Sequence, residues 1–176
     1  MVIGPGDRQT VPALVEALSY RIIPKYINRG KNVMSFTSPL DAARAQVFLA
    51  KYNSNISGEA YNVAREQVNY REMMKIITTY YNRREPKFSI TFWFFKLLLP
   101  LLRVLHKIFP KFKLIKTALS PLAIHYIGRS FIFDSRKLAN LGFEYKVNLE
   151  EAITARLKEL DPDKKLVKPN RRLKQK

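Results

Sequence analysis

The sequence predicts an α/β fold, and three features of the chain indicate it. Short apolar segments of about three to six residues alternate with longer segments whose apolar side chains repeat at helical spacing. Several of the longer segments begin at a good capping residue, such as Asn69 or Asn148. The chain has 176 residues, 47% of them hydrophobic, which suffices for one ordinary domain. The strands are nevertheless few and short for a complete parallel sheet.

The first elements lie close to the N-terminus. Residues 1–7, MVIGPGD, are typical of a strand end that enters a turn at Gly4-Pro5-Gly6. A helix is expected over residues 10–20, with Thr10 as its cap and Pro12 in its first turn, where the missing N–H costs nothing. Its apolar side is formed by Val11, Leu14, Val15 and Leu18.

Two strand–helix pairs follow. A strand over residues 32–36 precedes a helix that starts at Ser38 and runs to about Tyr52. The apolar residues at helical spacing in this helix are Leu40, Ala43, Val47 and Ala50. A strand is then expected over residues 59–64, and a helix from Asn69 to Tyr80 whose Glu72 completes a capping box.

The second half of the chain contains shorter elements. Strands are expected over residues 88–90 and 131–133, and helices over 136–140 and 149–160. Residues 161–176, DPDKKLVKPNRRLKQK, have little apolar content to bury, which predicts a basic disordered tail. The predicted organisation is therefore one folded unit over residues 1–160 and a tail over 161–176.

The most apolar stretch covers residues 88–112 and holds the only tryptophan, Trp93. Its charges before Phe109 are Lys96, Arg103 and Lys107, whose spacings of seven and four place them on one side of a helix. These charges interrupt the run too often for a transmembrane span. Three interpretations stay open, namely a core helix, a wall of an apolar ligand cleft and a helix lying on a membrane. Pro100 should kink or split the helix.

The formal net charge of +18 restricts the class of partner. Such a field attracts polyanions, including anionic lipid surfaces. No RNA-recognition motif, zinc knuckle or helix-turn-helix signature is present, so no specific nucleic-acid partner is expected. The absence of cysteine excludes disulfides and thiolate metal sites. No secretory leader is visible, so we expect a cytoplasmic protein or one that binds a membrane peripherally.

No catalytic constellation is visible in the sequence. The two histidines, His106 and His125, have no neighbouring carboxylate and nucleophile, and no metal site is predicted. None of the nine tyrosines is followed by lysine four positions later. Gly4-Pro5-Gly6 lacks the spacing of a phosphate-binding loop.

Five segments, taken in order, resemble motifs of the extended short-chain dehydrogenases, within the NAD-dependent epimerase/dehydratase superfamily. Residues 2–7, VIGPGD, resemble the family's V-Y-G-P-G-D, and residues 36–45, FTSPLDAARA, resemble F-T-Y-V-D-D-V-A-R-A. Residues 58–64, GEAYNVA, and 131–153, FIFDSRKLANLGFEYKVNLEEAI, resemble the strand and the C-terminal motif that follow. The apolar stretch after PKFSITFWF is most similar to the branch of 3β-hydroxysteroid dehydrogenases and sterol-4α-carboxylate 3-dehydrogenases.

The resemblance implies that the chain is the C-terminal portion of such an enzyme, comprising the last strands of a Rossmann-type sheet and a small, mostly helical substrate domain. The family's glycine-rich loop and its Tyr-x-x-x-Lys acid/base pair precede the matched region. In the second motif, Ser38-Pro39-Leu40 replaces Tyr-Val-Asp, and Asp41 keeps its acidic position. NAD or NADP is therefore expected to bind only together with an N-terminal nucleotide-binding half.

The resemblance also suggests site residues. Val2 matches a position that approaches the nicotinamide ring, and Gly4 and Pro5 match the turn after it; packing of a strand end explains all three equally well. Arg8 is a candidate for an anionic ligand group or an ordinary exposed arginine. Three residues of the apolar stretch are candidates for the substrate cleft or plain packing: Trp93, Phe94 and Leu98.

Two functions follow as hypotheses. The first is the substrate-binding half of an NAD(P)-dependent oxidoreductase that acts on a hydroxyl of an apolar, sterol- or isoprenoid-like molecule. This half should be inactive alone and should need a Rossmann-type partner chain. The alternative is a non-catalytic basic module of that fold which binds lipid or an anionic membrane. Either could form a homodimer.

Overall fold

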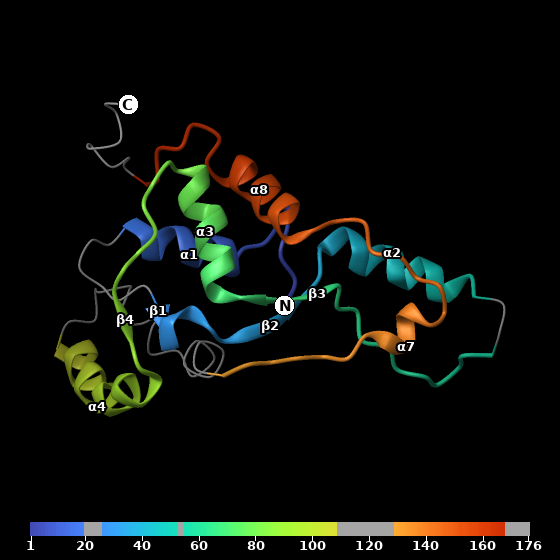
Figure 1. Cartoon of the computed structure of the whole chain (residues 1–176), viewed down its shortest axis with the longest axis horizontal. Helices are drawn as coiled ribbons and strands as arrows, with labels where there is room; N and C mark the ends of the chain where they lie inside the picture. Colours follow the sequence, from blue (N-terminus) through green and yellow to red (C-terminus); the bar gives the residue numbers. More distant parts are fainter. Residues whose placement is uncertain (20–25, 53–54, 109–128, 168–176) are drawn as a thin grey trace.

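The structure, a computed structural model, describes residues 1–19, 26–52, 55–108 and 129–167. Figure 1 shows a cluster of three helices above small β-sheets, with α2 and α7 toward one end of the long axis and α4 toward the other. The elements are α1 (Thr10–Ser19), β1 (Tyr26–Ile27), η1 (Asn28–Gly30), β2 (Val33–Phe36), α2 (Pro39–Ala50), β3 (Glu66–Asn69), α3 (Tyr70–Tyr80), β4 (Ser89–Ile90), α4 (Phe92–Ile108), α7 (Arg136–Ala139) and α8 (Leu149–Leu160).

The main core lies among α1, α3 and α8, which pack against the sheet of β2 and β3 (Figure 1). The predicted apolar side of α1 is fully confirmed, because all four of its residues are buried. In α8 the residues at three- and four-residue spacing are also buried. The largest fully buried side chains are Phe36, Ile3, Met73, Met74, Ile77, Leu138, Ile153 and Leu157.

Two pairs of strands form the described β-structure. Strands β2 and β3 are antiparallel, in a register that pairs Val33 with Asn69 and Phe36 with Glu66. On the other side, Phe131 forms an isolated parallel bridge to Met34, and Val2 forms one to Thr37. The strand predicted over residues 131–133 is thus reduced to one bridge. Strands β1 and β4 pair in parallel, with Tyr26 opposite Ser89. The mixed helix–strand composition confirms the predicted α/β class.

The strand predicted over residues 59–64 is wrong, because the strand lies at Glu66–Asn69 instead. Side chains of residues 135–145 form hydrogen bonds with backbone groups of residues 59–64. Lys137 Nζ donates to the Ala60 carbonyl at 3.1 Å, and Ser135 Oγ donates to the Ala64 carbonyl at 2.5 Å. The Ala64 amide in turn donates to the Tyr145 hydroxyl at 3.0 Å. These contacts replace the ladder that a strand would need.

The four apolar residues of α2 that repeat at helical spacing do not face the core. Leu40 and Val47 are 58% and 55% exposed, and Ala43 and Ala50 are exposed as well. The face that points inward carries Asp41 and Ala45, both fully buried. Phe48 and Leu49 also face inward, where they pack with Ala45 against Leu138 and Phe143. The helix therefore buries Asp41 with one apolar side and leaves a second set of apolar residues exposed.

The helix starts are mostly as predicted. Ser38 caps α2, and complete capping boxes join Asn69 to Glu72 in α3 and Asn148 to Glu151 in α8. In α1 the cap is Asp7 rather than Thr10. The Asp7 carboxylate accepts hydrogen bonds from the amides of Gln9, Thr10 and Val11 at 2.8–2.9 Å. A carboxylate three residues before the helix satisfies more amides than a threonine hydroxyl can.

Helix α4 runs from Phe92 to Ile108 without being split at Pro100. Its described apolar side chains are largely exposed, including Trp93 at 71% and Ile108 at 62%. The interpretation of this segment as a core helix is therefore wrong for these side chains. Within the described ranges, no helix is long and apolar enough to cross a bilayer. His125 lies outside the described residues.

The beginning of the predicted tail is folded. Asp161 is only 5% exposed and accepts hydrogen bonds from the Lys165 and Leu166 amides at 2.9 and 2.8 Å. Val167 is buried in the main core. The boundary predicted at residue 161 is therefore too early, because one buried carboxylate folds the following turn back onto the core. Residues 168–176 lie outside the described ranges.

Candidate functional site

The segment of residues 2–7 lies between the start of α2 and helix α8. The Ile3 amide donates to the Thr37 carbonyl and the Thr37 amide donates to the Met1 carbonyl, both at 3.0 Å. Gly4 is buried against Pro39, and a Cβ atom at this glycine would lie 2.6 Å from Pro39 Cδ. Any larger residue at position 4 would therefore push the segment away from α2.

The polar groups of this turn are already bound within the chain. The Gly6 amide donates to Glu159 Oε2 at 3.0 Å, and Arg156 Nε donates to the Asp7 carbonyl at 2.6 Å. The Asp7 carboxylate accepts hydrogen bonds from the first amides of α1, which would otherwise be free to bind an anion. With Glu159 and Asp7 beside it, the turn does not fit a phosphate group, and the described residues do not form a complete dinucleotide site.

The predicted cofactor residues accordingly have different environments. Val2 is 52% exposed at its bridge to Thr37, so its side chain is open to contact. Gly4 is buried, whereas Pro5 is exposed. Contact of these three residues with a nicotinamide stays a prediction.

Two polar residues beside Val2 were not predicted from the sequence. The register that pairs Phe36 with Glu66 places the next residues, Thr37 and Arg65, opposite each other. Thr37 Oγ1 and Arg65 Nη1 are both buried, and neither has a hydrogen-bond partner in the described part of the chain. Arg65 Nε lies 3.9 Å from Glu66 Oε1. Buried polar atoms without partners are uncommon in folded proteins, so this pair marks a candidate contact point.

No sequence signal could have identified that pair. Thr37 belongs to a quoted motif, but Arg65 does not, and 28 positions separate them. Only the antiparallel register brings them together.

Asp41, the acidic residue kept from the motif, has a structural role. Its carboxylate accepts hydrogen bonds from the Lys146 and Val147 amides, the latter at 2.9 Å, and from Arg44 Nη1 at 2.8 Å. Burial alone would raise the pKa of Asp41, but these amides, Arg44 and Ser38 together hold it below its ordinary value. Asp41 therefore stays ionised and fixes the segment that leads into α8.

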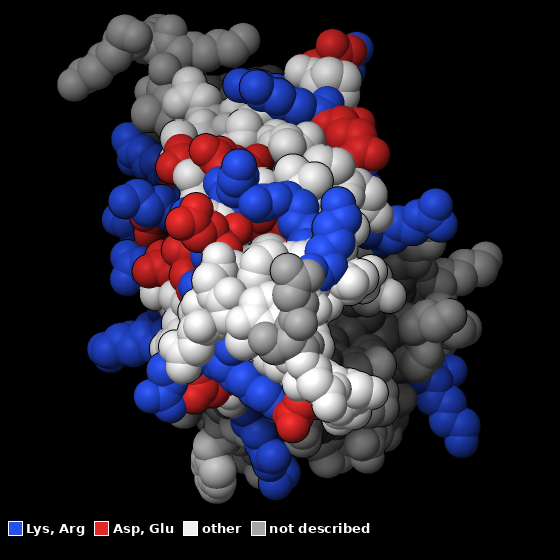
Figure 2. All heavy atoms as spheres, turned by 90° about the vertical axis from the view of Figure 1, so that its right-hand side faces the viewer, with Lys and Arg blue, Asp and Glu red and all other residues white. Residues whose placement is uncertain are grey.

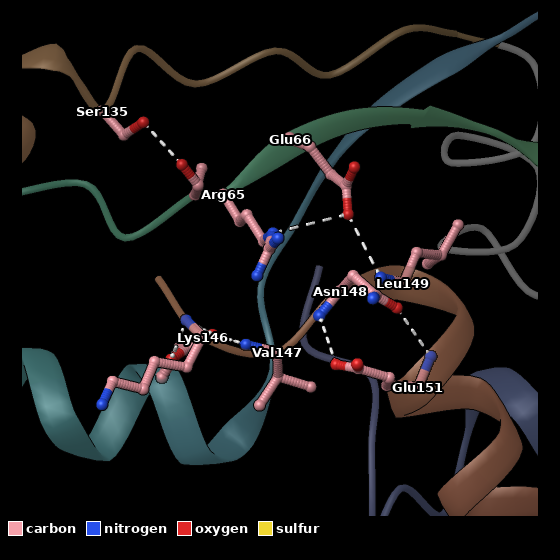
Figure 3. Close-up of polar contacts among 10 residues, drawn as sticks. Arg65, Glu66, Ser135, Lys146, Val147, Asn148, Leu149 and Glu151 are labelled. Atoms are coloured by element: carbon pink, nitrogen blue, oxygen red, sulfur yellow. Dashed lines mark hydrogen bonds and ion pairs between the residues drawn. The ribbon is translucent and has the colours of Figure 1, made fainter. Parts of the chain in front are cut away.

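Figure 3 shows how this junction is assembled around β3. Glu66 accepts a hydrogen bond from the Leu149 amide at 3.1 Å, next to the Asn148–Glu151 capping box. Ser135 donates to the backbone immediately before Arg65. The backbone on either side of Arg65 is thus held by polar contacts from two other parts of the chain, at Ser135 and at Leu149.

The predicted substrate residues lie apart from this junction. Arg8 is exposed in the turn before α1. Trp93 and Phe94 are 71% and 52% exposed on α4, and Leu98 is partly buried there. Figure 1 places α4 near one end of the molecule, away from the N-terminal segment at its centre. The described structure therefore does not bring the two groups together, and their roles stay predictions.

Charge differs between regions of the chain. Figure 2 faces the end that bears α2 and α7, and shows acidic as well as basic side chains around neutral surface. Residues 86–133, by contrast, contain eight lysines and arginines and no aspartate or glutamate. The sequence that contains α4 therefore carries only positive charge, whereas the surface at the α2 end carries both signs.

Comparison with known proteins relates the chain to one group of enzymes. No family model matches it. Sterol-4-alpha-carboxylate 3-dehydrogenase, decarboxylating, from Mus musculus is 24% identical over 157 residues, which cover 86% of this chain and 43% of that protein. The 3beta-hydroxysteroid-dehydrogenase/decarboxylase isoform 2 of Arabidopsis thaliana is 26% identical over 161 residues, covering 86% of this chain and 28% of that protein.

Solved structures show the same fold at lower sequence identity. UDP-glucuronic acid 4-epimerase from Bacillus cereus, solved in complex with NAD, has a TM-score of 0.57 and 16% identity; the match covers 94% of this chain and 44% of the epimerase. The structure of gox2253 has a TM-score of 0.62 and 15% identity, covering 96% of this chain and 48% of the other. The chain spans less than half the length of each of these relatives. The chain is therefore similar to the C-terminal part of extended short-chain dehydrogenases.

Proposed function

We propose that this chain is the substrate-binding portion of an NAD(P)-dependent oxidoreductase acting on a hydroxyl of an apolar, sterol- or isoprenoid-like molecule. The observation that carries the proposal is the match of 86% of the chain to a sterol-4-alpha-carboxylate 3-dehydrogenase, within the fold shared with an NAD-bound epimerase. The dinucleotide and the acid/base pair would come from a nucleotide-binding part, on the same polypeptide or on a partner chain.

The geometry of the described residues supports this division of labour. The Gly6 amide already donates to Glu159, and the first amides of α1 donate to Asp7. These amides are therefore not available to bind a pyrophosphate. No tyrosine in the chain has a lysine four positions later. We therefore expect that this portion alone neither holds the dinucleotide phosphates nor moves the hydroxyl proton, and that it performs no hydride transfer.

The outward face of α2 is the surface where the nucleotide-binding part would pack. Leu40 and Val47 are more than half exposed, and both lie on the same helix side as Ala43 and Ala50. Half-exposed Val2 lies at the strand end that leads into this helix, together with two buried atoms, Thr37 Oγ1 and Arg65 Nη1, that have no partner among the described residues. An apolar helix face with polar groups beside it has the composition of a protein interface.

The decisive experiment isolates a tagged form of the chain from its own cell and identifies whatever co-purifies in stoichiometric amount. We expect a nucleotide-binding polypeptide with a glycine-rich loop and Tyr-x-x-x-Lys. The complex should reduce NAD or NADP with a 3β-hydroxysterol, whereas the purified chain should not. Turnover by the purified chain would refute the division of labour. A complex inactive on hydroxysterols and isoprenoid alcohols would refute the substrate class. A chain that purifies alone would refute the existence of a separate nucleotide-binding partner chain.

A matched pair of variants locates the contact. Val47 on α2 and Leu101 on α4 are both 55% exposed. Val47→Glu should lower recovery of the nucleotide-binding polypeptide at least about tenfold, because a carboxylate would be buried in the interface. Leu101→Glu should leave recovery unchanged. Equal recovery with both variants would exclude the α2 face as the docking surface.

A further inference from the structure

The geometry of α4 points to a second surface, by which the chain lies on an anionic membrane with α4 in the lipid interface. This inference is independent of the proposed oxidoreductase function. It rests on three features of the described structure: an exposed apolar stripe along the whole helix, lysines beside that stripe, and attachment of the helix to the folded body at its N-terminal end.

The apolar stripe is continuous along α4. At about 100° per residue, its members fall within an arc of about 100° on the helix surface. All of them are more than half exposed, at 52–71%: Trp93, Phe94, Leu97, Leu101, Val104 and Ile108. Phe88, just before the helix, is 80% exposed. A contiguous exposed apolar surface of this kind marks an interaction site.

Lysines lie along one border of the stripe. Lys96 and Lys107 are both exposed, and their positions fall about 40–60° from Trp93 on the side away from Leu101. Long lysine side chains can keep their ammonium groups at the phosphate level while the helix face enters the acyl region. This arrangement of aromatic and aliphatic residues beside lysine is typical of helices that lie in a membrane interface.

The charge of the surrounding sequence favours lipid over a second protein surface. The eight basic residues of segment 86–133 have no acidic neighbour in that segment. The cytoplasmic leaflet is negatively charged, and each nearby lysine or arginine strengthens binding to it. The same unbalanced charge would repel α4 of a second copy of this chain. Helix α4 is about 25 Å long at 1.5 Å per residue, and it does not qualify as a span.

The helix is fixed at its start, so the body would follow it onto the surface. Strand β4 pairs with β1, and the Phe92 amide donates to Asn28 Oδ1 at 2.9 Å. The Arg29 amide donates to Ser89 Oγ at 2.8 Å. In Figure 1, α4 projects from the end opposite α2, which leaves the α2 face free for a protein partner.

The test measures binding of the whole chain to vesicles of phosphatidylcholine, with and without phosphatidylserine, by flotation and by tryptophan fluorescence. Because Trp93 is the only tryptophan, its emission reports on α4 alone. We expect flotation with anionic vesicles, together with a shift of the emission to shorter wavelength. No flotation would overturn the inference, and so would flotation without a shift, since that result would show charge attraction elsewhere on the chain.

Variants separate α4 from the rest of the surface. Leu101→Glu should weaken anionic-vesicle binding at least about tenfold, because it places a carboxylate in the stripe. Val47→Glu, at an equally exposed position on α2, should bind as the unaltered chain does. Lys96→Gln with Lys107→Gln should weaken binding to anionic vesicles. Equal losses with Leu101→Glu and Val47→Glu would overturn the assignment to α4.

A second copy of the chain is the competing occupant of this stripe. Sedimentation without lipid decides this point: a dimer that Leu101→Glu converts to monomers, with no vesicle binding by either protein, would show that α4 joins two copies. Failure of the vesicle test would leave the proposed oxidoreductase function intact, because that function is tested by the co-purifying polypeptide and its turnover.

Discussion

Thr37 and Thr78 are both almost fully buried, at 4% and 1% exposed, but within the described ranges the Thr78 hydroxyl has a partner and the Thr37 hydroxyl has none. Thr78 Oγ1 donates to the Lys75 carbonyl at 2.9 Å, whereas Thr37 Oγ1 has no partner among the described residues. A buried polar atom without a hydrogen bond destabilises the fold, so position 37 is occupied by a residue that the isolated chain does not need for stability. This difference favours a contact role for Thr37.

Thr37→Val should therefore raise the free energy of unfolding of the isolated chain by about 1 kcal/mol, because it removes an unsatisfied hydroxyl and keeps the β-branched shape. Thr78→Val is the control, and should lower the free energy by about 1 kcal/mol through loss of a satisfied hydrogen bond. Urea unfolding followed by circular dichroism measures both. A destabilised Thr37→Val variant would show that the hydroxyl does have a partner in this chain.

Two buried aspartates should make the fold sensitive to acid. Burial would raise the pKa of Asp161, but the Leu166 and Lys165 amides and the Tyr81 hydroxyl hold it below its ordinary value, as the contacts of Asp41 do for that residue. A carboxyl whose pKa is lowered on folding stabilises the fold above its unfolded pKa of 3.8, and this stability is lost as the pH falls through the folded-state pKa.

We therefore expect the urea midpoint to change little between about pH 7 and pH 5, and to fall steeply below about pH 4. Asp41→Asn should lower the free energy of unfolding at pH 7 by about 3 kcal/mol, because its amide cannot accept the same hydrogen bonds, and should flatten the acid dependence. A midpoint in Asp41→Asn that falls with pH as steeply as in the unaltered chain would contradict the role assigned to this carboxylate.

At the scale of single elements, the helix starts depend on asparagine caps. Asn148 accepts the Glu151 amide at 2.8 Å, and the Glu151 carboxylate accepts the Asn148 amide at 3.1 Å. Asn69 and Glu72 make the same pair at the start of α3. Helices α3 and α8 pack on one another in the main core, so the two caps stabilise a shared structure.

Asn148→Ala and Asn69→Ala should each lower the free energy of unfolding by about 1 kcal/mol. Asn140→Ala, at an exposed position after α7 with helical backbone angles, should change it by less than about 0.5 kcal/mol. Thermal and urea unfolding of the three variants would measure this ranking. A loss at Asn140 as large as at Asn148 would show that the effect is not specific to caps.

At the scale of the whole molecule, two exposed apolar surfaces lie at different ends of the long axis (Figure 1). The α2 face is next to a strand end where two buried polar atoms have no partner among the described residues. The α4 stripe lies in a segment, residues 86–133, whose charged residues are all basic. We assign the first to a nucleotide-binding part and the second to an anionic membrane.

Because the two surfaces are separate, the variants Val47→Glu and Leu101→Glu should have opposite effects in the two binding assays. Each variant should weaken one interaction at least about tenfold and keep the other. Neither should change the free energy of unfolding by more than about 0.5 kcal/mol, since both side chains are exposed. Loss of both interactions in one variant would mean that the two surfaces act as one.

The sequence by itself determined the α/β class, the resemblance to extended short-chain dehydrogenases, the caps at Ser38, Asn69 and Asn148, and the buried faces of α1 and α8. These features are local, because they depend on side chains within one or two helical turns of each other.

Only the tertiary structure decided the orientation of α2, the position of β3, the folded turn after Asp161 and the pairing of Thr37 with Arg65. In each case a contact between distant residues overrides the local pattern. Asp41 accepts hydrogen bonds from amides 105 and 106 residues away, and α2 packs Ala45, Phe48 and Leu49 inward while Leu40 and Val47 stay exposed. Hydrophobic periodicity shows which side of a helix is apolar, but only the contacts of the folded chain show whether that side is covered by this chain or left for a partner.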